Sequence, residues 1–220
     1  MADAITFVLT SCGRFDLLDR TLSSFFANNT AAIARYLVIE DSGDEAVRDV
    51  AARFPHPIEV IVNVPRLGQI ASIDKAYATV TTPYVFHCED DWRFLRPGFI
   101  EESRIVLEGD PTISVVSCRR LDQRRTLAFV LDAPVVRCGA VTYRRDERGH
   151  PFWGGYTFNP GLRRMADYRR LGSFARWGHE HDASLFFKKA GMTVGYLAEP
   201  ACETTGADRR LPKPDLRRDA

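Results

Sequence analysis

The first half of the chain alternates short β-rich runs with segments of helical spacing, and this alternation constrains the fold more than any other feature. The β-rich runs are Ile5–Thr10, Tyr36–Glu40, Ile58–Asn63, Tyr84–Cys88 and Ile113–Cys118. Between them, apolar residues recur every three or four positions, as a helix with one buried face requires. Such alternation is typical of βαβ units. The sequence therefore predicts an α/β fold with a mainly parallel twisted sheet flanked by helices.

The pattern changes after residue 118. Shorter β-rich runs predict a small antiparallel region at Thr126–Leu131, Val135–Cys138 and Ala140–Tyr143. Helical spacing follows over Leu162–Leu171 and Asp182–Ala190, and Thr193–Leu197 is the last predicted strand. We expect one domain with two halves, 1–118 and 119–206, followed by a basic Pro/Arg tail over 207–220.

Composition bears on the compartment in which the protein is expected, but it does not identify the partners of the protein. The net charge of the 220 residues is +1, so charge gives no reason to expect nucleic acid as a partner. No run approaches ~20 apolar residues, the length that spans a membrane. The five cysteines are widely spaced without a CxxC pair, which fits a reducing compartment. We expect a cytoplasmic protein, and leave peripheral contact with the inner face of a membrane open.

Acidic residues follow two of the predicted strands directly. Glu40 and Asp41 end the second run, and Glu89, Asp90 and Asp91 follow the fourth. Ligands of open parallel sheets bind at the carboxyl ends of the strands, so both clusters should face one crevice. Adjacent carboxylates repel, and a divalent cation such as Mg²⁺ or Mn²⁺ removes that repulsion. The alternative is an acidic loop or helix start without a ligand.

Several other nucleotide-binding and sugar-processing classes lack support. The chain has no GxxxxGK[ST] and no GxGxxG, so neither a P-loop nor a dinucleotide fingerprint is present. A sugar nucleotidyltransferase needs a glycine-rich phosphate loop early in the chain, where only Gly13 occurs. A glycoside hydrolase uses two carboxylates but needs no further acid cluster for a metal diphosphate.

Four segments resemble the donor half of family-2 glycosyltransferases of the GT-A fold: Thr10–Arg14, Glu40–Ser42, Leu67–Gly68 and Glu89–Asp91. The resemblance covers about residues 4–118 and resumes at 152–197. It implies that residues 1–118 bind the nucleotide sugar and that 119–206 hold the acceptor and the catalytic base. It places the donor nucleotide near Thr10, Arg14, Asp41, Arg66, Glu89 and Asp90. It makes Asp91, with Glu89, the ligand of Mn²⁺ or Mg²⁺.

A second segment, Trp177–Gly191, resembles the family's stretch of acids before a helix that ends in Ala-Gly. By this resemblance Glu180 is the catalytic base, Asp182 is the last acid, and His179 replaces the usual first acid. Inverting transfer needs one base opposite the leaving diphosphate, so an acid here has a chemical reason. The alternative is that Glu180 and Asp182 only stabilise a helix N-terminus. His179 and His181 remain open as metal ligands or rival bases.

The acceptor side rests on an aromatic, glycine-rich loop. Trp153, Gly154 and Tyr156 offer ring planes and close backbone approach, so we expect them, with Asp182, around the acceptor. Ordinary aromatic core is the alternative, favoured for Phe158. Many family members carry a late metal-binding histidine, which the region 199–206 lacks. Either Glu203 substitutes for it, or Asp91, the diphosphate and water hold the metal.

The sequence thus predicts an inverting, metal-assisted hexosyltransferase-type enzyme. Its donor is a nucleotide diphosphate sugar, with uridine diphosphate as the default, and its acceptor is a saccharide, glycolipid or other hydroxyl compound. The missing histidine and the substitution at His179 keep a second possibility open, namely a nucleotide-sugar binding protein of the same fold without activity. A sugar nucleotidyltransferase is the remaining alternative.

Overall fold

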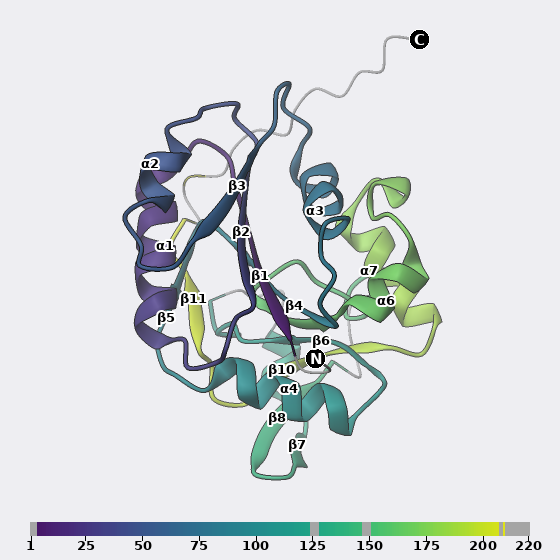
Figure 1. The fold of residues 1–220 in the computed structure, drawn as a ribbon. Coiled ribbons are helices and arrows are strands. Elements are labelled where there is room, and N and C mark those ends of the chain that lie inside the picture. Colours follow the sequence, from purple (N-terminus) through teal and green to yellow (C-terminus); the bar gives the residue numbers. More distant parts are fainter. Residues whose placement is uncertain (1–3, 124–127, 147–150, 207–208, 210–220) are drawn as a thin grey trace.

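A nine-stranded sheet forms the centre of the protein (Figure 1). The structure, a computed structural model, describes residues 4–123, 128–146, 151–206 and 209. In sheet order the strands are β3 (Ile58–Val62), β2 (Arg35–Glu40), β1 (Ile5–Ser11), β4 (Tyr84–Glu89), β9 (Gly161–Arg164), β6 (Ile113–Ser117), β10 (Thr193–Leu197), β8 (Val141–Arg145) and β7 (Val135–Cys138). Only β9 and β8 run antiparallel to their neighbours on both sides, so the other strands of this sheet point one way. The predicted α/β class with a mainly parallel sheet is confirmed.

Helices cover both faces of this sheet, as the continuous apolar strands require. The helices are α1 (Phe15–Asn28), α2 (Val47–Ala51), α3 (Gln69–Tyr77), α4 (Phe99–Gly109), α5 (Ala128–Leu131), α6 (Met165–Leu171) and α7 (Glu180–Lys189), with a short 3₁₀ turn at Ala175–Trp177. One face packs on α1, α2 and α4, and the other on α3, α6 and α7. None of the helices in the described ranges is long and apolar enough to cross a membrane.

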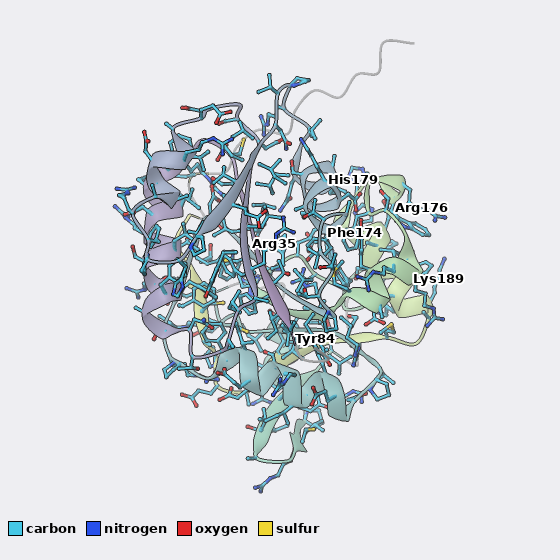
Figure 2. The ribbon with its side chains drawn as sticks, in the orientation of Figure 1. Arg35, Tyr84, Phe174, Arg176, His179 and Lys189 are labelled. Atoms are coloured by element: carbon cyan, nitrogen blue, oxygen red, sulfur yellow. The ribbon has the colours of Figure 1, made fainter. Side chains whose placement is uncertain are left out.

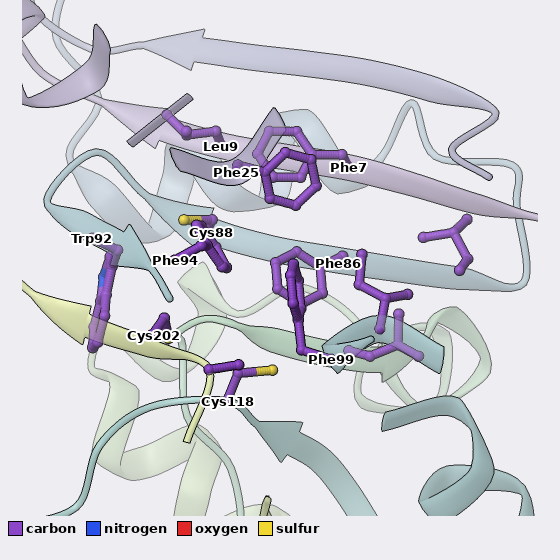
Figure 3. Packing of buried hydrophobic residues seen from close by; sticks show 14 of the residues in the cluster. Phe7, Leu9, Phe25, Phe86, Cys88, Trp92, Phe94, Phe99, Cys118 and Cys202 are labelled. Atoms are coloured by element: carbon purple, nitrogen blue, oxygen red, sulfur yellow. The ribbon is translucent and has the colours of Figure 1, made fainter. Parts of the chain in front are cut away.

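The core under α1 and α4 is largely aromatic (Figure 3). The ring centroid of Phe7 on β1 lies 4.1 Å from that of Phe25 on α1, and Phe86 on β4 lies 5.4 Å from Phe99 on α4. Cys88, Cys118 and Cys202 fill the space beside them as buried free thiols. This packing fixes β4, and with it the acidic segment that follows.

The structure corrects two sequence predictions and adds a small sheet that the sequence did not predict. The predicted helix Leu162–Leu171 begins as strand β9, which pairs with β4 and β6, and turns helical only at Met165. The predicted strand Thr126–Leu131 contains helix α5 at Ala128–Leu131, and its first two residues lie outside the described part. A two-stranded sheet of β5 (Trp92–Phe94) and β11 (Cys202–Thr204) was not predicted, because three-residue strands have no readable periodicity.

Candidate functional site

The acidic segments meet at the carboxyl edge of the parallel strands. In the sheet Ser11 is the partner of Glu40, and Thr10 is the partner of Glu89. Glu40 Oε1 accepts hydrogen bonds of 2.8 Å from the backbone N–H groups of Gly13 and Ser42. Its carboxylate thereby ties the loop after β1 to the loop after β2. The structure therefore places both acidic segments at one edge of the sheet, where Thr10 is buried, and a ligand crevice there stays a prediction.

Asp41 is buried and organises the loop that leads into α3. Its carboxylate accepts 2.8 Å hydrogen bonds from the N–H groups of Leu67 and Gly68, and a 2.9 Å bond from Ser72 Oγ. Arg66 Nε lies 3.5 Å from Asp41 Oδ2. Gly68 has φ +87, a backbone conformation that suits glycine at this turn into the helix. Asp41 and Arg66 thus lie together, and their contact with a donor nucleotide stays a prediction.

Arg14 joins the two aspartates of the second acidic segment. Its guanidinium pairs with Asp90, to which Nε donates at 3.2 Å, and its Nη1 lies 3.3 Å from Asp91 Oδ2. Asp90 is only 1% exposed, and burial raises the pKa of its carboxyl to about 6 against the opposing effect of Arg14. Asp91 is half-buried. The structure therefore brings together all three residues, with Asp90 directed at Arg14 and Ser11.

Glu89 stands at the end of β4 among other carboxylates. It accepts hydrogen bonds from Gln69 Nε2 at 2.6 Å and from Trp92 Nε1 at 3.1 Å. Burial, Asp91 and Glu180 together raise its pKa to about 8. Because a carboxyl of such pKa holds a proton at neutral pH, a cation near this group would be favoured in exchange for that proton. Glu180 contributes to this raised pKa from the first turn of α7.

Glu180 opens helix α7 and is held by the loop before β9. Its Oε1 accepts hydrogen bonds from Thr157 Oγ1 at 3.1 Å and from the Phe158 N–H at 2.9 Å. His179 is the N-cap residue, and the structure records no side-chain cap for this helix. Two donors on one oxygen orient a carboxylate, which is what a catalytic base needs. The alternative, that Glu180 and Asp182 stabilise the helix N-terminus, fits equally well, since both residues lie in the first turn of α7.

The acidic side chains at this edge of the sheet could hold a cation only if a bound ligand supplied further oxygen atoms to it. Among the described residues no group of three or more His, Cys, Asp or Glu side chains is placed to hold a metal ion. Glu203 pairs with Arg93 and, at 3.3 Å, with Arg120, and Asp91 likewise lies 3.3 Å from Arg14. Asp91 and Glu89 are the acids to which the resemblance assigns the cation. This arrangement fits a cation that receives its other oxygens from a diphosphate and water.

The predicted acceptor residues separate into exposed and buried ones. Trp153 is 37% exposed, whereas Tyr156 is 2% exposed and stacks 4.7 Å from Phe187. The ring of Tyr156 therefore packs in the core, where a sugar cannot reach it in this structure. Asp182 is half-buried and lies 3.3 Å from His181 Nε2. The core interpretation also holds for Phe158, which is buried.

Sequence reasoning missed the side chains that support these acids. Asn63 and Ser72 bond Asp41, Gln69 bonds Glu89, and Thr157 bonds Glu180. The only local signal for Gln69 and Ser72 is that they lie in the first turn of the helix that follows Leu67–Gly68, one of the segments that resemble the family. Asn63 and Thr157 are polar residues in buried positions with no motif around them.

A buried acid lies beneath the aromatic loop. Asp146 Oδ1 is buried without a hydrogen-bond partner, and Gly154 covers the carboxylate so closely that a Cβ there would lie 2.7 Å from Oδ2. Burial raises the pKa of Asp146 to about 6 despite Lys188. Its contribution to stability is thus present below pH ~4 and lost as the pH rises through 6.

We expect Asp146→Asn to stabilise the protein by about 1 to 3 kcal/mol at pH 8 and by clearly less at pH 4.5. Urea unfolding at both pH values measures this. Asp122→Asn is the control: Arg120 lowers the pKa of that exposed carboxyl, so it is ionised at both pH values and the effect of the variant should be the same at pH 4.5 and pH 8. Equal effects of Asp146→Asn at both pH values would contradict the assignment.

No protein-family model and no curated protein sequence matches this chain. Solved structures do match. A mannosyltransferase from Pyrobaculum calidifontis, solved with GDP-Man and Mn²⁺, aligns over 93% of this chain and 57% of its own, with TM-score 0.70 and 16% identity. S. aureus TarS 1-349 aligns over 93% and 61%, with TM-score 0.67 and 13% identity. GalNAc-T7, solved with UDP, GalNAc and Mn²⁺, aligns over 90% and 43%, with TM-score 0.63 and 13% identity.

This chain spans roughly half of the length of these structures. At such low identity the likeness concerns the fold and not the substrates. The structural neighbours are glycosyltransferases of one architecture, and they share with this chain a large, mostly parallel sheet between helices. The protein therefore has the GT-A fold of nucleotide-sugar glycosyltransferases.

Proposed function

We propose that the protein is an inverting glycosyltransferase that moves a sugar from a nucleoside diphosphate, by default uridine diphosphate, to an acceptor hydroxyl with the help of Mn²⁺ or Mg²⁺. One observation carries this proposal. The carboxylate of Glu180 is oriented by two hydrogen bonds, and it lies close enough to Glu89 to raise the pKa of that residue. These two features support a base in the neighbourhood of an acidic segment of the kind that holds a metal diphosphate.

Each of these residues has a distinct role in the proposed transfer. Asp91 and Glu89 hold the cation, which when bound stabilises negative charge on the departing diphosphate. Thr10, Arg14, Asp41, Arg66 and Asp90 line or support the nucleotide side. Glu180 takes the proton of the acceptor hydroxyl as the new bond to the anomeric carbon forms and the bond to the diphosphate breaks. Thr157 and the Phe158 N–H keep its carboxylate in place for this transfer.

The first test is ligand binding. We measure the melting temperature with UDP, GDP and dTDP, each with and without Mn²⁺. A ligand at a hundred times its Kd stabilises the folded protein by about 2.7 kcal/mol. The proposal expects at least one nucleoside diphosphate to raise the melting temperature, and Mn²⁺ to increase that rise. No response to any of them would overturn it.

The second test is Glu180→Gln. This change keeps the shape of the side chain and removes the base, so we expect transfer to fall by about 10²–10⁴-fold while nucleotide binding stays unchanged. Initial rates of nucleoside diphosphate release with the corresponding sugar donors measure it. Glu101→Gln is the control, since Glu101 is also a first-turn glutamate but lies beside Ile5 at the opposite edge of the sheet. Nucleotide binding without any turnover in the unaltered protein would instead support the inactive binding protein.

A further inference from the structure

A series of hydrogen bonds leads from a buried arginine to Glu180. Arg119 Nη1 donates to Asn159 Oδ1 at 2.8 Å, and Asn159 Nδ2 donates to Thr157 Oγ1. Thr157 Oγ1 in turn donates to Glu180 Oε1 at 3.1 Å, at the start of α7, where Figure 2 labels the preceding residue His179. We call Arg119, Asn159 and Thr157 the polar network. Arg119 is 2% exposed and Thr157 6% exposed, so water competes little for these bonds.

Further contacts hold the polar network in place. The guanidinium of Arg119 lies over the Trp92 ring, with Cζ 5.3 Å from the ring centroid. The backbone of Asn159 is held on both sides, because Arg163 Nη2 donates to its carbonyl oxygen at 2.9 Å and its N–H donates to Thr157 Oγ1 at 3.2 Å. Arg163 is itself 1% exposed. The network is therefore preorganised, as the support of a catalytic group requires.

The direction of each hydrogen bond in the polar network follows from Arg119. A guanidinium has only donors, so the side-chain oxygen of Asn159 must face Arg119 and its NH₂ group must face Thr157. Thr157 Oγ1 then accepts two hydrogen bonds from Asn159, and its single proton is left for Glu180. A hydroxyl that donates to a carboxylate favours the ionised form of that carboxylate, which is the form that can take a proton.

We infer that Asn159 and Arg119 are positioning residues for the proposed transfer, because together they keep the hydroxyl proton of Thr157 directed at Glu180. This inference rests on the proposed function, in which Glu180 takes the proton of the acceptor. It goes beyond that function, which names only the two groups that bond Glu180 directly. The alternative is that the polar network only holds the loop before β9, so that its loss lowers stability and leaves the chemistry unchanged.

The test is Asn159→Asp in the full chain. This change keeps the shape of the side chain and its bond from Arg119, but it places a second acceptor oxygen against Thr157 Oγ1, so the hydroxyl proton turns away from Glu180. We expect kcat to fall at least about tenfold, the effect of losing a hydrogen bond to a charged group, while KM for the donor stays within about twofold. Release of nucleoside diphosphate is measured with UDP-glucose, UDP-N-acetylglucosamine, GDP-mannose and dTDP-glucose, in the presence of Mn²⁺ and with water as the acceptor.

Variants of Thr157 give a second measurement of the same effect. Thr157→Val removes the hydroxyl and should lower kcat by a similar factor, whereas Thr157→Ser retains the hydroxyl and should keep most of the rate. Adding Asn159→Asp to Thr157→Val should cause no further loss of kcat, because no hydroxyl proton remains to be redirected. Ser114→Ala is the matched control, since Ser114 also carries a buried hydroxyl that bonds the same loop, at the Gly155 carbonyl oxygen. It should leave kcat within about twofold.

The outcomes separate the inference from the proposed function. Turnover that is lost in Glu180→Gln but retained in Asn159→Asp and Thr157→Val overturns the inference alone. The inference is also overturned if these two variants lower the free energy of unfolding in urea without lowering kcat. Should Asn159→Asp fail to fold, equal rates of Thr157→Ser and Thr157→Val would overturn it. No turnover of any donor by the unaltered protein overturns the proposed function, and the inference with it.

Discussion

Asp91→Ala is expected to lower the metal-dependent release of nucleoside diphosphate at least about a thousandfold. The reason is that the proposed function assigns the cation to the carboxylates of Asp91 and Glu89, and this change removes one of the two. Stabilisation of a leaving group by a metal ion is worth several kcal/mol, and ~4 kcal/mol corresponds to this factor. The rate is measured at saturating donor over a series of Mn²⁺ concentrations.

Loss of structure must be separated from loss of the metal. Arg14 keeps its pairing with Asp90 in this variant, so the fold should be retained, and circular dichroism checks this. Asp122→Ala serves as the control, because it also removes a carboxylate paired with an arginine, but at an exposed position. If Asp91→Ala kept more than a tenth of the metal-dependent rate, another group would have to hold the cation, and the site as described would be wrong.

Gly155→Ala is expected to destabilise the protein by at least about 3 kcal/mol. Its added methyl group would lie 2.0 Å from the Ser184 oxygen and 2.5 Å from the Lys188 nitrogen, both of which are backbone atoms of α7. Backbone atoms cannot rotate away, so the loop or the helix has to move, and the Ser184 bonds to the loop are lost with that movement. Urea unfolding at pH 7 measures the change in the free energy of unfolding.

Gly109→Ala is the matched control for this change. A methyl group there would lie 2.3 Å from Cys138 Sγ, which is a side-chain atom that can change rotamer. Gly109 also ends helix α4, where alanine has the better helix propensity. The control should therefore cost far less than Gly155→Ala. Similar losses in both variants would mean that α7 and the aromatic loop are not packed as tightly as described.

The carboxyl edge of the sheet was predictable from the sequence, and the reason is local. Each parallel strand is a continuous apolar run, so its last residue and the acids after it can be located by inspection. Glu40 ends β2 and Glu89 ends β4, the two strands that flank β1, and Asp41 follows Glu40 directly. The first helix, Phe15–Asn28, follows from its apolar spacing in the same way.

Strand β9 could not be predicted because its stability depends on contacts far away in the sequence. Two adjacent arginines, Arg163 and Arg164, are typical of a solvated helix face. Arg163 is instead 1% exposed, donates to Tyr77 Oη at 3.2 Å and to the Asn159 carbonyl oxygen at 2.9 Å, and lies over the ring of Tyr156. Of these partners Tyr77 lies 86 residues earlier in the chain, and β9 itself pairs with β4 and β6, so the sequence near Arg163 does not indicate that its side chain is buried.

The same limit applies to the candidate base. The position of Glu180 was predicted by resemblance, but the hydrogen bonds that orient it come from Thr157 and Phe158, more than twenty residues earlier. For Tyr156 the sequence suggested a position around the acceptor, whereas the structure places its ring in the core. A loop rich in aromatic residues and glycine gives no local sign of which rings face the core, and only the packing against Phe187 decides it.

The position of β9 has a mechanical consequence. The strand comes from the second half of the chain, yet it lies between β4 and β6 and hydrogen-bonds to both. Strands from both halves therefore alternate in one sheet. The two halves cannot rotate apart as rigid bodies without breaking the hydrogen bonds on both sides of β9. Any movement that admits or releases substrates is therefore confined to the loops at the rim, while the strands beneath them stay rigid.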